Sequence, residues 1–304
     1  QAQAGKSYEI VIEFKQIKDG AYFNFDLVED IPLNMNATLE KLKDTEIVIF
    51  AGGISPLLEG EEMKVSAAGF KGGDRTDIEL PAVQRNVLAA LKKAGKKVIF
   101  VNFSGSAMAL TPETENCDAI LQAWYPGQEG GTAVAEALFG KYNPGGRLPL
   151  TFYNSMDELP PFDDYAVKKG RTYQYFTGKP LYEFGYGLSY TKFNYRKLNI
   201  ASKQDTISIQ FSISNTGKYD GDEVAQVYVQ YPETGTYMPI KQLKGFKRVH
   251  IKKGQTQNVS ISIPKKELRY WDEKTRKFVT PSGNYIFQVG SSSQRINLQK
   301  TFAL

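Results

Sequence analysis

The spacing of the apolar residues changes along the chain, and this change limits the possible folds more than any other feature. Before residue 140, short continuous apolar runs alternate with segments in which apolar residues recur every three or four positions. From residue 195 onward, apolar and polar residues alternate in short segments that are separated by turn residues. The first pattern is typical of an α/β layer and the second of antiparallel strands with one buried face. The chain of 304 residues therefore predicts two domains, α/β and then all-β.

The first domain is predicted to be a mainly parallel sheet with flanking helices. Residues 80–95 have helical spacing, with a proline near the first turn, lysines in the last turn and a glycine at the end. Residues 130–140 form a second helix of small residues. The buried strands are expected in residues 47–51, 96–105 and 117–127. This order of strands and helices predicts an α/β layer.

The second domain is predicted to be an antiparallel β-sandwich of the immunoglobulin-like type. Short strands with a period of two, separated by turn signals, are typical of such sandwiches. Trp271 is expected in its core, and His250 is expected on a strand without a functional role. The expected strands are residues 205–215, 222–232, 242–251, 256–264 and 284–290.

Two other segments have a character of their own. Residues 141–192 contain too many glycines and prolines for regular elements, yet too many tyrosines and phenylalanines for a flexible linker, so we expect a packed wrapping segment. Residues 8–27 alternate in character around a Lys-Asp-Gly turn and predict a β-hairpin. Because an isolated hairpin is only marginally stable, this one should belong to a larger sheet.

Composition excludes several classes of function. The net charge is +5 and the lysines are scattered rather than clustered with aromatics, which argues against a nucleic-acid partner. The sequence has no run of about 18 apolar residues, and its first ten residues lack the charged and apolar regions of a signal peptide. The one cysteine, Cys117, excludes an intrachain disulfide and is expected in the core. With a single histidine, we expect catalysis to rest on carboxylates.

The acidic stretch LEGEEMKVSAAGFKGGDRTDIELP, residues 58–81, is the main candidate for a site. It leaves the carboxyl end of a predicted parallel strand, where ligands bind in open α/β sheets. Its glutamates lack the regular spacing of Mg²⁺ or Ca²⁺ loops, and the glycines before it lack the third glycine of a nucleotide-binding loop. Two interpretations carry more weight: a solvated loop with salt bridges to Arg75, and a general acid. Glycosidic hydrolysis needs such an acid together with a second carboxylate.

Three long motifs resemble the carboxyl-terminal half of glycoside hydrolase family 3, the β-glucosidases and β-xylosidases. They are the acidic stretch, WYPGQEGGTAVAEALFGKYNPGGRLPLTFY and GRTYQYFTGKPLYEFGYGLSYTKFNY, and they stand in the family's order. The resemblance implies three parts. Residues 1–30 would be the tail of an inserted β-sandwich domain similar to the anthrax protective antigen. Residues 31–192 would be the carboxyl-terminal portion of an α/β sandwich domain with the wrapping segment, and residues 193–304 a fibronectin type III-like domain.

The resemblance also implies site residues. The family's acid/base lies in a Glu-x-Glu element shortly before Asp-Arg and Leu-Pro pairs, and the acidic stretch carries all three. We therefore expect Glu61 to be the general acid/base, with Glu59 or Glu62 as the alternatives. Asp74 and Arg75 would support the site by pinning its loop. The resemblance implies neither a cofactor nor a metal.

The family's barrel and its nucleophile have no counterpart in this sequence. We therefore expect the chain to be a carboxyl-terminal fragment, inactive alone, whose partners are a missing amino-terminal barrel domain and β-linked glucosides or xylosides. A retaining enzyme needs two carboxyl groups about 5–5.5 Å apart, and this chain would supply one. Export to the periplasm or secretion is implied by the resemblance, and neither a membrane nor a nucleic acid is expected as a partner. The alternative function is a non-catalytic carbohydrate-binding or scaffold module.

Overall fold

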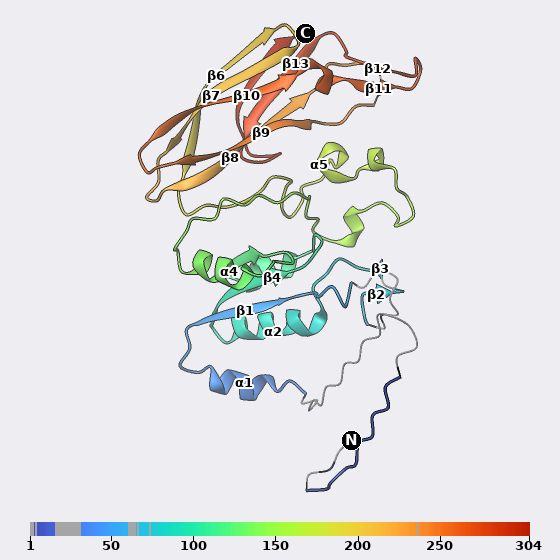
Figure 1. Cartoon of the computed structure of the whole chain (residues 1–304), viewed down its shortest axis with the longest axis vertical. Helices are drawn as coiled ribbons and strands as arrows, with labels where there is room; N and C mark the ends of the chain where they lie inside the picture. The colour runs from blue at the N-terminus through green and yellow to red at the C-terminus, as the bar shows by residue number, and fades with distance from the viewer. Residues whose placement is uncertain are drawn as a thin grey trace. The chain divides into compact units, whose positions relative to one another are not determined.

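The computed structural model describes residues 3, 5–15, 32–59, 65, 67–72, 74–235 and 237–304. They belong to two compact units, residues 1–42 and 43–304 (Figure 1). The smaller unit contains helix α1 (Met35–Lys41), which begins where the Asn34 side chain accepts the Ala37 N–H. The prediction of a hairpin strand is wrong for residues 8–15, which form no strand; without a larger sheet to join, such a hairpin is only marginally stable. Its remaining residues, 16–27, lie outside the described residues.

The larger unit begins with the predicted parallel sheet. Its order is β1-β4-β5, and its strands are β1 (Ile47–Gly53), β4 (Lys97–Phe103) and β5 (Ala119–Gln122). Helix α2 (Ala82–Lys93) connects β1 to β4 and buries Leu88 and Leu91. Helix α3 (Thr111–Asn116) connects β4 to β5, and α4 (Gly130–Leu138) follows β5. Cys117 is buried at the end of α3, as predicted.

A small hairpin interrupts the path from β1 to α2. It consists of β2 (Phe70–Lys71) and β3 (Asp74–Arg75), with Phe70 opposite Arg75. The N–H of Thr76 donates to the carbonyl of Gly69 and closes its base. The predicted site residues Asp74 and Arg75 therefore lie on a strand instead of an open loop.

The aromatic segment packs, as predicted, without long regular elements. It contains two short 3₁₀ turns, η1 (Met156–Glu158) and η2 (Val167–Lys169), and the single-turn helix α5 (Thr172–Tyr175). The Tyr173 ring stacks on Phe184 with centroids 4.4 Å apart and meets Tyr228 of the sandwich edge-on at 5.8 Å. Aromatic pairs of this kind stabilise the packing of the segment against the sandwich.

The larger unit consists of two modules: the parallel sheet with its helices, and a sandwich of two antiparallel sheets (Figure 1). Its core consists of inward-facing aliphatic and aromatic side chains from both sheets, among them Ile207, Val227 and Phe287, all fully buried. One sheet has the order β10-β7-β6, the other β14-β13-β8-β9. The strands are β6 (Phe193–Lys203), β7 (Thr206–Asn215), β8 (Gly221–Gln230), β9 (Gln242–Ile251), β10 (Thr256–Pro264), β13 (Asn284–Gly290) and β14 (Ile296–Ala303).

The prediction that Trp271 lies in the core is wrong. After the 3₁₀ turn η3 (Lys265–Leu268), the strands β11 (Tyr270–Asp272) and β12 (Lys277–Val279) pair as a separate hairpin. Trp271 is 50% exposed there and packs edge-on against Phe278, its cross-strand neighbour. A hairpin of two three-residue strands outside both sheets has no interior in which to bury the ring.

A buried ion pair joins the aromatic segment to the sandwich. Arg147 Nη2 lies 2.7 Å from Glu223 Oε2, and the two side chains are only 8% and 3% exposed. The Tyr195 hydroxyl donates to the other carboxylate oxygen of Glu223 at 2.6 Å. Burial and the neighbouring carboxylate both raise the pKa of Tyr195, so the phenol keeps its proton. This contact fixes the start of the sandwich against the chain that leaves α4.

Candidate functional site

The candidate site lies at the carboxyl edge of the parallel sheet, where β1, β4 and β5 all end. The end of β1 is held by Gln84 of α2, whose amide accepts the Gly53 N–H and donates to the Gly53 carbonyl, both at 2.7 Å. Gly53 has φ +123°, and a Cβ there would approach the Phe103 carbonyl oxygen to 1.9 Å. Only glycine permits this close approach of β1 to β4.

Glu59, the first glutamate of the acidic stretch, binds two residues at this edge. One carboxylate oxygen, Oε1, accepts the Ser106 hydroxyl at 2.8 Å, and the other, Oε2, accepts the Tyr125 hydroxyl at 2.5 Å. Ser106 follows β4 and Tyr125 follows β5. Glu59 therefore ties the segment after β1 to the ends of β4 and β5, the other two strands of the sheet.

Arg75 reaches the same edge from β3. Its Nη1 donates to the Ser106 hydroxyl at 3.1 Å and its Nη2 to the Glu79 carbonyl at 3.3 Å, while Nε is buried without a partner. Burial lowers the pKa of the Arg75 guanidinium, and the carboxylates of Glu59 and Asp77 oppose this shift. Arginine stays protonated in proteins, so Arg75 remains a cation near the Glu59 carboxylate.

Tyr125 is brought to Glu59 by a sharp turn directly after β5. Trp124 has a left-handed backbone with φ 58°, which is uncommon for a residue with a side chain, and its ring packs edge-on against Phe152. Burial and the hydrogen bond to Glu59 raise the pKa of Tyr125 to about 12. The phenol therefore keeps its proton near neutral pH and acts as a donor.

A polar layer beneath this cluster fixes the strand ends. The Asn102 amide donates to Gln122 Oε1 at 2.7 Å and to the Ser104 hydroxyl at 3.2 Å. The Ser104 hydroxyl in turn donates to the Ser106 carbonyl at 3.0 Å. Because Asn102 and Ser104 are fully buried, these bonds hold the turn that presents Ser106.

The structure describes only some of the predicted site residues, and it brings two of these together. Glu61 and Glu62 lie outside the described residues. Glu59 and Arg75 belong to one cluster, whereas Asp74 is exposed on β3 opposite Lys71. Ser106 and Tyr125 were not predicted, although each follows the carboxyl end of a predicted strand, and the rule that drew attention to Glu59 applies to them as well.

Within the described ranges, no group of three or more His, Cys, Asp or Glu side chains is placed to hold a metal ion. Among these residues there is also no helix with the length and apolar character needed to cross a bilayer.

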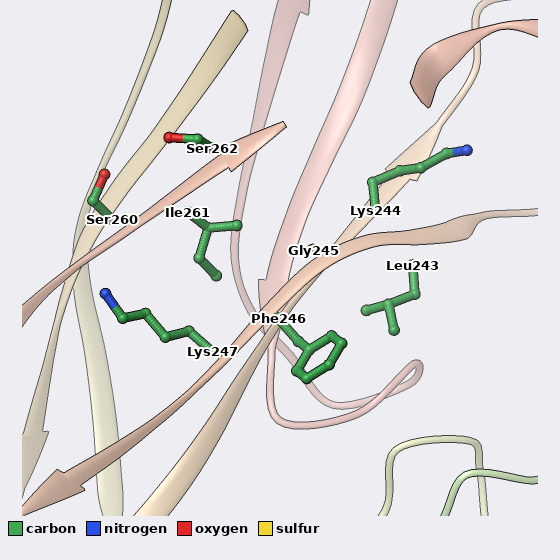
Figure 2. Close-up of a pocket in the computed structure, with 8 residues that line it drawn as sticks. All are labelled: Leu243, Lys244, Gly245, Phe246, Lys247, Ser260, Ile261 and Ser262. Carbon is green, nitrogen blue, oxygen red and sulfur yellow. The ribbon is translucent and has the colours of Figure 1, made fainter. Parts of the chain in front are cut away.

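A separate groove lies on the sandwich, between the edge strands β9 and β10 (Figure 2). Ile261 fills the space beside Gly245, where a Cβ would approach it to 2.6 Å, and the Phe246 ring is 67% exposed. The groove contains lysines and serines but no carboxylate, so it offers no general acid. Its lining residues are Leu243, Lys244, Gly245, Phe246, Lys247, Ser260, Ile261 and Ser262.

The two modules define an α/β domain followed by a fibronectin type III-like domain. Residues 7–190 match the model of the glycosyl hydrolase family 3 C-terminal domain, and residues 223–293 match that of the fibronectin type III-like domain. The chain therefore belongs to glycosyl hydrolase family 3.

Relatives share this arrangement over part of their length. The chain is 48% identical to a xylan 1,4-β-xylosidase of Xylanibacter ruminicola, over 99% of the chain and 35% of that protein. It is 36% identical to a periplasmic β-glucosidase of Salmonella typhimurium, over 76% of the chain and 32% of that protein. The crystal structure of a Kluyveromyces marxianus β-glucosidase in complex with glucose has a TM-score of 0.80 at 30% identity, covering 89% of the chain and 33% of that chain. The chain thus spans about a third of the length of these relatives.

Proposed function

We propose that this chain supplies the general acid/base of a retaining exo-β-glycosidase, and that Glu61 is that residue. The observation that carries the proposal is the position of two described residues of the acidic stretch, one on each side of Glu61. Glu59 and Arg75 are both bound at the carboxyl edge of the parallel sheet, where ligands bind in open α/β folds. Membership of glycosyl hydrolase family 3 supports the reaction class.

In the proposed reaction, Glu61 first donates a proton to the glycosidic oxygen as the leaving group departs. The same group then accepts a proton from the water that hydrolyses the glycosyl-enzyme intermediate. The nucleophilic carboxylate would come from an amino-terminal barrel, in the part of the relatives that this chain does not span. Without that second carboxylate no covalent intermediate forms, so we expect the isolated chain to be inactive.

The relatives guide the choice of substrate and compartment. The xylan 1,4-β-xylosidase supports β-xylosides as the first class to assay, and the β-glucosidases support β-glucosides as the second. The periplasmic relative supports export from the cytoplasm.

The test compares the full-length polypeptide with its Glu61→Ala variant on aryl β-xylosides and β-glucosides. Loss of the proton donor should lower kcat/KM by about 10²–10⁴-fold for poor leaving groups, and far less for leaving groups that depart without protonation. An exposed glutamate changed in the same way, Glu115→Ala on α3, is the matched control. Equal rates for wild type and Glu61→Ala on the poor leaving groups would refute the proposal.

A second candidate function is polysaccharide binding by the sandwich. It is supported by the exposed Phe246 ring on β9 in Figure 2, because an exposed aromatic ring offers an apolar face to a sugar ring. Binding of the isolated chain to xylan or cello-oligosaccharides, lost in Phe246→Ala, would support it. Binding by neither protein would exclude it.

A further inference from the structure

One hydroxyl group connects both ends of the segment that carries Glu61. The Ser106 hydroxyl donates to Glu59 Oε1 at 2.8 Å and accepts from Arg75 Nη1 at 3.1 Å. Glu59 directly precedes residues 60–73, and Arg75 stands just after them. The hydrogen bonds run in one direction: the guanidinium donates to the hydroxyl, and the hydroxyl donates to the carboxylate. The two described residues Glu59 and Arg75, which stand on either side of Glu61 in the sequence, are therefore joined through one side chain at the end of β4.

Both carboxylate oxygens of Glu59 are occupied as acceptors. Ser106 occupies Oε1 and Tyr125 occupies Oε2, and the Arg75 cation lies beside them. An ionised carboxylate is a pure acceptor and suits this environment, whereas a proton donor must direct an O–H group at the substrate. The geometry of Glu59 is that of a structural anion.

The packing around Glu59 leaves no room for an additional side chain. A Cβ at Gly105 would approach Tyr125 Cε2 to 2.5 Å and Glu59 Oε2 to 3.0 Å. The backbone between Ser104 and Ser106 thus lies directly against the carboxylate and the phenol ring. The position of Glu59 is set by contacts with the segments after β4 and β5 and not by its own loop alone.

We propose that Glu59 is a positioning residue, and that Glu59, Ser106 and Arg75 form an anchor which holds the neighbouring acid/base in place. The inference rests on the proposed role of Glu61 and assigns a different role to the adjacent glutamate. Breaking the anchor should misplace the proton donor without removing it. Displacement of a catalytic group by about 1 Å can cost about 10²-fold in rate.

The kinetic test uses the full-length polypeptide and the variants Ser106→Ala and Ser106→Thr. Ser106→Ala removes the shared hydroxyl, and Ser106→Thr keeps one. For Ser106→Ala we expect kcat/KM to fall about 10- to 100-fold on poor leaving groups and less than about 3-fold on activated ones, because proton donation matters only for the former. The alkaline limb of the pH profile should move as well, since the acid's surroundings change. Ser106→Thr should recover most of the loss.

Limited digestion of the isolated chain with trypsin tests the anchor without an activity assay. Ser106→Ala and Glu59→Gln should speed tryptic cleavage within residues 60–75 at least several-fold, whereas Glu115→Gln should not. Unchanged cleavage, or an equal loss on all substrates with an unmoved pH profile, would overturn the anchor. If Glu59→Ala alone gives the full acid/base phenotype and Glu61→Ala is silent, both proposals fail. If Glu61→Ala behaves as proposed and the anchor variants match wild type, only the anchor fails.

Discussion

Replacing Arg147 with methionine should destabilise the chain by about 3–5 kcal/mol, because it leaves a buried carboxylate without its counter-ion. Glu223 is 3% exposed and has two described partners, the Arg147 guanidinium at 2.7 Å and the Tyr195 hydroxyl at 2.6 Å. After the substitution only the neutral hydroxyl remains. The methionine fills much of the arginine's volume, so the cost reflects the lost charge pair more than a cavity.

The double variant Arg147→Met with Glu223→Gln separates the charge from the packing. Glutamine removes the buried charge and still offers an oxygen to Tyr195. Replacing a whole buried ion pair is often close to neutral, so we expect the double variant to recover to within about 2 kcal/mol of wild type. The two substitutions should therefore be strongly non-additive.

Urea unfolding monitored by tryptophan fluorescence and circular dichroism measures these differences. A loss of about 3–5 kcal/mol corresponds to a fall in Tm of roughly 10 °C for a unit of this size. The control is Arg248→Met, which breaks an ion pair with Asp222 in which the arginine side chain is 64% exposed; it should cost less than about 1 kcal/mol. If Arg147→Met costs no more than Arg248→Met, the assignment of a stabilising buried pair is wrong.

Three further predictions concern other residues. Burial raises the pKa of the Cys117 thiol to about 12, so a thiol reagent at pH 8 should react with the unfolded chain and hardly with the native one; equal rates would contradict the burial. Burial raises the pKa of Tyr285 to about 12, so the folded state keeps a proton that the unfolded state releases near pH 10. Stability from this group should be complete below pH 10 and fall as the pH rises to 12, and urea midpoints that stay constant from pH 9 to 11 would refute this. Gly105→Ala should cost about 1–3 kcal/mol because its Cβ strikes the Tyr125 ring, and a Tyr125→Leu background should relieve part of that cost in the same urea assay.

The fold was largely predictable because its main strands have strong local signals. The continuous apolar runs at β1 and β4 and the alternation in β7 and β10 are properties of short stretches of sequence. The strands β6 and β14 were missed because β6 buries only two of its residues and β14 none, which leaves little alternation to detect. Trp271 was misplaced because an aromatic residue in a short β segment has the same local pattern on an exposed hairpin as in a core.

The site was predictable only in part, because its contacts are tertiary. Glu59 stood out through the charge of its neighbours and the strand before it. Its partners Ser106 and Tyr125 lie 47 and 66 residues further along the chain. Ser106 belongs to none of the three motifs, and the motif that contains Tyr125 does not reveal that its hydroxyl binds Glu59. A serine after a strand becomes an anchor only when parallel pairing brings that strand's end beside the acidic segment. Sequence reasoning could have listed the residues after each strand, but not the bonds between them.

The most direct test of the central claim is the product that the full-length Glu61→Ala variant forms with azide. Azide needs no general base, so it should replace water and attack the glycosyl-enzyme from the face that the acid/base occupies. An activated aryl β-glycoside should then be consumed faster with added azide, and the product should be the glycosyl azide of unchanged β configuration. No rate increase and no glycosyl azide, or the same product from Glu59→Ala instead, would contradict the assignment of Glu61.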